Sequence, residues 1–127
     1  MFIKCKFEID RGEYVPSRGW GHVIRYIEFA EDFIPVRHVD HYENGNVLRY
    51  HSTHYLDEFD MLADARFDGK SMTSWWGTEY EFCSEAEFEC AWTVPGNPEI
   101  TERQLSTRQT MMGREKCPYR ELYARNG

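Results

Sequence analysis

"VRHVDHYENGNVLRYHSTHY", residues 36–55, decides the fold, because two β-rich runs flank one turn signal, Asn44-Gly45. An Asn-Gly dipeptide between such runs indicates a β-hairpin closed by a two-residue type I′ turn, in which both residues take a positive φ. The same stretch holds four of the five histidines of the chain. Whether their imidazoles meet depends on the strand register, since side chains alternate between the two faces of a sheet.

A two-residue turn pairs position 43 with 46 and fixes every further pair along the hairpin. His38 then faces His51, and Asp40 faces Arg49, so these four side chains share one face. The other two histidines, His41 and His54, fall on the opposite face. The imidazoles do not surround one point as the ligands of a zinc ion do, and we therefore predict no metal site.

The sequence on either side of the hairpin predicts further strands and helices. "FIKCKFEID" alternates apolar and charged residues, which is typical of a strand with one buried face, and "HVIRYIEFA" is apolar enough on both faces for a central strand. "LDEFDMLADARF" predicts a helix over residues 56–67, "TEYEFC" a strand over 78–83, and Ser84 with Glu87 a capping box that begins another helix. We expect an α+β fold: an antiparallel sheet of about five strands with two or three helices packed on one face.

The charges divide the chain into two parts. Residues 1–94 contain 9 basic and 18 acidic residues and form the predicted single α+β domain. Residues 95–127 contain 6 basic and 4 acidic residues and are expected to be a polar, mildly basic C-terminal extension, with either a short helix near 100–112 or partial disorder.

Composition excludes several classes of function. A net charge of −7 opposes binding to the phosphates of nucleic acid, which requires clustered Lys and Arg. No apolar run approaches the length that spans a membrane, and the alternating N-terminus is unlike a signal peptide. The four cysteines show neither a CxxC pair nor zinc spacing, so we expect reduced thiols in a cytoplasmic protein without a cofactor.

One enzymatic hypothesis follows from the hairpin. His38 and His51 could act as base and acid of a two-histidine phosphodiesterase or nuclease, with Asp40 beside them and Arg49 stabilising phosphate charge. "HST" at 51–53 resembles half of the H-x-T signature of two-histidine phosphoesterases. That family requires a second copy of the signature, which this sequence lacks. The alternative that we favour for the four residues is a polar cross-strand ladder.

A second hypothesis concerns the acidic stretch "TEYEFCSEAEFE" and the tryptophan pair before it. An exposed Trp beside carboxylates is typical of the residues that dominate binding energy in protein interfaces. A solvated acidic face with both tryptophans in the core is the structural alternative. The candidate partner-binding residues are Trp75, Trp76, Glu79, Glu81, Glu85 and Glu89.

The succession "VIRYIEF", "VRHVDHYENGNVLRY" and "EAEFECAW" resembles a class of small, uncharacterised bacterial domains. Their pattern is an early strand, a hairpin closed by x-Gly, and a final helix with E-F-x-x-x-W, which is Glu87 to Trp92 here. The resemblance covers roughly residues 21–93 and implies a member of a toxin–immunity or phage–host conflict system.

Together these observations predict a protein-binding inhibitor, an immunity protein that neutralises a basic toxin or nuclease through an acidic, aromatic surface. The alternatives are the two-histidine enzyme and a phage-encoded inhibitor of a host defence complex.

Overall fold

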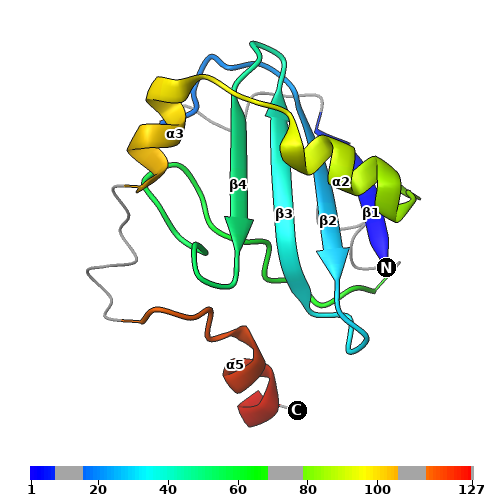
Figure 1. The fold of residues 1–127 in the computed structure, drawn as a ribbon. Coiled ribbons are helices and arrows are strands. Elements are labelled where there is room, and N and C mark those ends of the chain that lie inside the picture. The colour runs from blue at the N-terminus through cyan, green and yellow to red at the C-terminus, as the bar shows by residue number, and fades with distance from the viewer. Residues whose placement is uncertain (8–15, 69–78, 106–113, 127) are drawn as a thin grey trace.

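Five strands form one antiparallel sheet with helices packed against it, which confirms the predicted α+β class. Figure 1 shows how these elements are arranged. The computed structural model describes residues 1–7, 16–68, 79–105 and 114–126. Its strands are β1 (Phe2–Phe7), β2 (Val23–Phe29), β3 (Pro35–Tyr42), β4 (Val47–His51) and β5 (Tyr80–Phe82), and they lie in the order β4-β3-β2-β1-β5. Its helices are α2 (Glu85–Thr93), α3 (Pro98–Leu105) and α5 (Tyr119–Asn126).

The first two strands follow their predicted patterns. In β1, Ile3 and Cys5 are buried while Lys6 is exposed, as alternation requires. β2 lies between β1 and β3, which explains why it is apolar on both faces. The predicted last residues of the first strand, 8 to 10, lie outside the described residues.

The turn of the central hairpin differs from the prediction by one residue. The Tyr42 amide donates to the Asn46 carbonyl at 2.9 Å, and the Gly45 amide donates to the Tyr42 carbonyl at 2.9 Å, so the loop has three residues. Gly45 has a φ of 93°, whereas Asn44 is not among the positive-φ residues. A three-residue loop is the second common way in which an x-Gly pair closes a hairpin: a type I turn is followed by a glycine with a positive φ.

The longer loop shifts the register of β3 and β4. His38 pairs with Tyr50 and Arg37 pairs with His51, so the predicted pairing of His38 with His51 is wrong. A shift of one residue exchanges the faces of a strand. His38 and Asp40 now face one side of the sheet, and Arg49 and His51 face the other.

The predicted helix over residues 56–67 is also wrong: this segment is irregular and covers the sheet face that carries His38. The Asp57 carboxylate accepts hydrogen bonds from the amides of Phe59 (2.8 Å) and Asp60 (3.1 Å), while the Asp57 amide donates to the Asp60 carbonyl (3.0 Å). Such local bonds compete with a helix. The Leu62 amide then donates to the Tyr55 carbonyl (2.7 Å) and closes the loop, with Phe59 and Leu62 still buried.

Helix α2 lies across the opposite face, as Figure 1 shows. Its predicted N-cap is confirmed, because the Ser84 hydroxyl accepts a hydrogen bond from the Glu87 amide at 3.0 Å. Phe88 and Ala91 are buried, and Ala91 packs with Val39 and Val47 of the hairpin. Positions 88 and 91 lie three residues apart, the spacing at which apolar residues share one side of a helix.

The C-terminal segment contributes to the core of the domain. Ile100 of α3 and Tyr119 of α5 are buried in the same cluster as Leu48 and Tyr50 of the sheet. The Tyr119 hydroxyl also donates to the Leu62 carbonyl. None of the described helices is long and apolar enough to cross a membrane.

A charged pair lies inside the sheet core. The Arg25 guanidinium donates to both carboxylate oxygens of Asp40, at 2.7 and 2.9 Å, and to Asp60 at 3.1 Å. Both side chains of the Arg25–Asp40 pair are almost fully buried. Burial alone would raise the pKa of Asp40, but the Arg25 charge, the hydrogen bonds from Arg25 and the neighbouring His38 together outweigh burial and hold that pKa far below its usual range.

His38 beside this pair makes stability depend on pH. Burial, and then the Arg25 charge, lower the pKa of His38 below its ordinary value of 6.5. Below pH 6.5, His38 is therefore protonated in the unfolded chain and remains neutral in the folded chain. Because the unfolded state binds more protons, the free energy of unfolding falls with decreasing pH, by at most about 1.4 kcal/mol per pH unit.

We expect His38→Asn to reduce this slope in urea unfolding measured between pH 5 and 8, since the Asn oxygen can still accept the Ala63 amide that His38 Nδ1 now accepts at 3.0 Å. The exposed His22→Asn is the matched control and should keep the wild-type slope. An equal slope in His38→Asn and wild type would contradict this assignment.

Candidate functional site

The structure separates the four residues of the predicted catalytic set. His38 and Asp40 are fully buried in the core, with their side chains 3.4 Å apart. Arg49 and His51 project from the opposite face of the hairpin. His38 Nδ1 accepts the Ala63 amide, so its remaining proton lies on Nε2 beside Asp40. The two imidazoles cannot act on one substrate, and the two-histidine centre is not formed.

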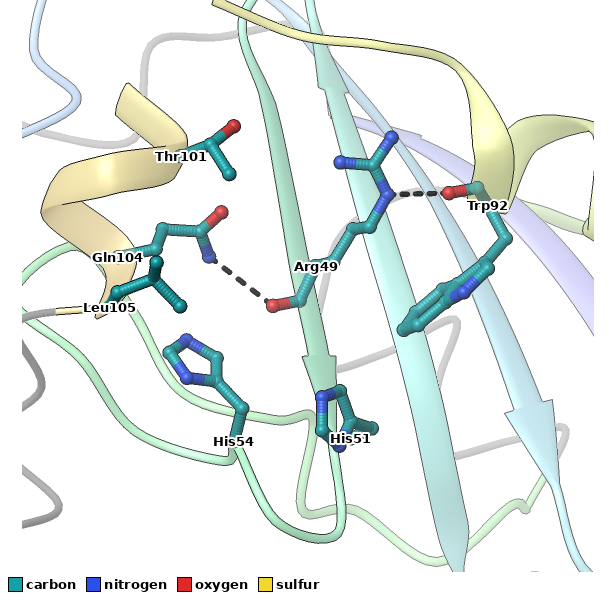
Figure 2. Close-up of a pocket in the computed structure, with 7 residues that line it drawn as sticks. All are labelled: Arg49, His51, His54, Trp92, Thr101, Gln104 and Leu105. Atoms are coloured by element: carbon teal, nitrogen blue, oxygen red, sulfur yellow. Dashed lines mark hydrogen bonds between the residues drawn. The ribbon is translucent and has the colours of Figure 1, made fainter. Parts of the chain in front are cut away.

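A pocket of about 170 Å³ lies between the edge strand β4, the end of α2 and helix α3 (Figure 2). Its position follows from the register, which places Arg49 and His51 on the side of α2. Two imidazoles, a guanidinium and an indole surround it, together with polar and apolar side chains of α3. The lining residues are Arg49, His51, His54, Trp92, Thr101, Gln104 and Leu105.

Asp57 fixes two of the side chains that line this pocket. Its Oδ2 atom accepts hydrogen bonds from His54 Nε2 at 3.0 Å and Gln104 Nε2 at 3.0 Å, and its Oδ1 atom accepts one from the Tyr50 hydroxyl at 2.8 Å. Gln104 Nε2 also donates to the Arg49 carbonyl at 3.2 Å, which attaches α3 to the β4 edge. The pocket is therefore held in shape by a buried carboxylate with several donors.

The titration of these groups reflects their surroundings. Burial would raise the pKa of Asp57, but hydrogen bonds from His54, Gln104 and the backbone outweigh it and lower that pKa. Burial lowers the pKa of His51, and the His54 and Arg37 charges lower it further. His51 Nδ1 accepts the Thr53 amide at 3.3 Å, so neutral His51 carries its proton on Nε2 and can donate it to a ligand.

Arg49 joins the pocket to the end of α2. Its Nε donates to the Trp92 carbonyl at 2.5 Å, as Figure 2 shows, and its Nη2 donates to the Val94 carbonyl. From the neighbouring strand, His41 Nε2 lies 2.7 Å from the Ala91 carbonyl. The last turn of α2 contains no basic residue of its own, so side chains of the sheet bind the carbonyls that a helix end leaves open.

The predicted partner-binding residues fall into three groups. Trp75 and Trp76 lie outside the described residues. Glu79, Glu81 and Glu85 are exposed on β5 and at its two sides, where the hypothesis requires them. Glu89 is instead engaged in the structure: its carboxylate accepts a hydrogen bond from Arg37 Nη2 at 2.5 Å, and we remove it from the candidate surface.

Phe82 is a residue of this surface that the sequence did not reveal. By strand alternation, Phe82 projects from the same face of β5 as Tyr80. It pairs across the strands with Ile3 of β1, which is fully buried. Its side chain is nevertheless 62% exposed, because β5 is the outermost strand of the described sheet. No sequence signal distinguishes an outermost strand from an inner one at this length. We call the exposed residues Phe82, Glu79, Glu81 and Glu85 the β5 surface; Phe82 projects from the opposite face of this outermost strand from Glu79 and Glu81.

Among the described residues no group of three or more His, Cys, Asp or Glu side chains could hold a metal ion. Comparison with protein-family models, with curated proteins and with solved structures finds no match for this chain. The resemblance to bacterial conflict-system domains therefore stays a prediction.

Proposed function

We propose that this protein binds and inhibits a basic protein partner through the β5 surface, in the manner of an immunity protein that neutralises a toxin or nuclease. The observation that carries the proposal is the exposure of Phe82, a large aromatic side chain on the outermost described strand β5, where Glu81 and Glu85, on either side of it in the sequence, are exposed as well. Interfaces of this kind combine a few aromatic anchors with charges that set specificity.

The charge of the chain supports a basic partner. The domain is strongly acidic, and Glu81 and Glu85 are exposed close to Phe82 in the sequence. Opposite charge on the partner speeds the encounter, and Phe82 then supplies apolar area that is removed from water when the complex forms. A nuclease presents such a basic surface because it binds phosphates, so the bound inhibitor blocks the surface that the nucleic acid needs.

Charge reversal at the β5 surface tests this proposal. We expect the full-length protein to capture a basic protein from the native lysate, and Glu81→Lys/Glu85→Lys to slow association with that protein by roughly tenfold or more at low salt. Because long-range attraction is screened by ions, added salt should slow the wild type more than the variant. Surface plasmon resonance of the purified pair at two ionic strengths measures both effects.

The matched control is Glu99→Lys/Glu102→Lys, which makes the same change in net charge on exposed positions of α3. It should associate much faster than the β5 variant. Equal slowing by both variants would mean that overall charge, and not this surface, attracts the partner. Capture of an acidic protein whose binding neither variant alters would contradict the proposal.

A further inference from the structure

Arg49 differs from the other buried or half-buried arginines in its partners. Arg25 is bound by Asp40 and Asp60, and Arg37 is bound by Glu28 and Glu89. Arg49 donates only to main-chain carbonyls, and within the described part of the chain no carboxylate lies within ion-pair distance of it. Burial without an acidic neighbour lowers its pKa, which shows that its charge is incompletely compensated.

The unbalanced charge lies on the wall of the pocket shown in Figure 2. Nε and Nη2 of Arg49 bind the end of α2, which leaves Nη1 with no hydrogen bond to a described residue. Figure 2 shows the guanidinium between Trp92 on α2 and Thr101 on α3. His51 lines the same pocket and carries a further donor, its Nε2–H, so the polar chemistry of the pocket suits an oxyanion.

The rest of the lining suits a flat apolar group. Trp92 forms one wall, with its ring centroid 6.2 Å from that of His51, and Leu105 lies on the α3 side. A volume of about 170 Å³ accommodates one six-membered ring, since a cavity of about 150 Å³ holds benzene. The pocket is too small for a nucleotide or a folded peptide segment, and ligand sites of larger molecules are usually about 300 Å³ or more.

We propose that this pocket binds a small aromatic carboxylate, with the carboxylate at Arg49 and the ring against Trp92, beside His51. The site is independent of the β5 surface, because β4 and β5 are the two outermost strands at opposite ends of the described sheet. The hydrogen bonds that Asp57 accepts from His54 and Gln104 hold the pocket before the ligand arrives, which reduces the entropy lost on binding.

Benzoate and benzamide test the proposal, since the two molecules have nearly the same shape and differ in charge. We expect benzoate to bind the full-length protein at least tenfold more tightly than benzamide in calorimetry at pH 7 and constant ionic strength. Amide chemical shifts should change at Arg49, His51, Trp92 and along α3. Inorganic phosphate is an anion without a ring, so its affinity compared with that of benzoate gives the contribution of the ring. We expect phosphate to bind at least tenfold more weakly than benzoate.

Two variants locate the site. Arg49→Gln should reduce benzoate affinity at least tenfold, and Arg103→Gln on the exposed side of α3 should leave it unchanged. Because Arg49 also binds the end of α2, we add a second variant that leaves this contact intact. Leu105 lines the pocket and is 75% exposed, so Leu105→Asp places a carboxylate beside the pocket. Leu105→Asp should abolish binding, while its control Leu122→Asp on α5 should not.

Three outcomes would overturn the proposal. Equal affinity for benzoate and benzamide would show that no cation recognises the ligand. Equal affinity for phosphate and benzoate would show an anion site without a ring pocket. Benzoate binding that survives Leu105→Asp would place the ligand elsewhere on the protein.

Discussion

Replacement of Asp40 by Ala is expected to lower the free energy of unfolding by about 3–5 kcal/mol, because it leaves the Arg25 guanidinium in the core without its main counter-ion. Asp60 remains as a partner of Arg25, but its side chain is partly exposed and binds through a single oxygen at 3.1 Å. Urea unfolding followed by circular dichroism measures the loss as a lower midpoint at an unchanged slope.

The double variant Arg25→Met/Asp40→Leu separates the charge from the packing. A buried ion pair stabilises little by comparison with apolar side chains of similar volume, so the double variant should recover most of the loss. A loss below about 1 kcal/mol in Asp40→Ala would contradict a core in which these two charges depend on each other. A double variant as unstable as Asp40→Ala would show that the rest of the core requires the pair itself.

Replacement of Phe82 by Ser is expected to weaken binding to the captured partner by about 30-fold to 1,000-fold, equivalent to about 2–4 kcal/mol, because aromatic anchors dominate interface energies. The same change should alter the free energy of unfolding little, since the side chain is mostly exposed and lies at the end of the sheet. Calorimetric titration and urea unfolding of one preparation give both values.

The matched control for Phe82 is Leu122→Ser, which removes another exposed apolar side chain, on α5. It should bind the partner with wild-type affinity. If Phe82→Ser also binds with wild-type affinity, the aromatic side chain is not part of the interface, whatever the charge-reversal variants show.

The sequence predicted much of the fold because local signals and burial agreed along the strands and in α2. Ser84 is both a good N-cap and the residue before an apolar helical spacing, and both signals point to a helix at the same position. In β2, the apolar residues on both faces require a position inside the sheet, which the structure confirms.

The errors arose where one short signal has two physical solutions. Asn44-Gly45 fits a two-residue turn and a three-residue turn equally well by composition, and the two differ by one residue of register. Asp57 suits the first turn of a helix, and it also suits a loop in which its carboxylate binds nearby amides. Which of the two structures forms depends on Tyr50 and Gln104, which donate hydrogen bonds to Asp57. These contacts are not visible in the local sequence pattern around Asp57.

The candidate site was predicted less well than the fold for the same reason. The register error placed His51 beside His38, whereas the structure places it with Trp92 and His54. The contribution of α3 to the pocket depends on Gln104 reaching the Arg49 carbonyl, a contact over more than fifty positions of sequence. Exposure of the acidic residues near β5 was predictable because charged side chains on alternating positions remain in water.

Hydrogen exchange on the complex with the captured basic partner tests the central claim most directly. If the β5 surface is the interface, amides of β5 and the first turns of α2 become protected on binding, while β4 and α3 at the opposite edge exchange as in the free protein. Protection confined to β4 and α3, with residues 79–90 unchanged, would contradict the account.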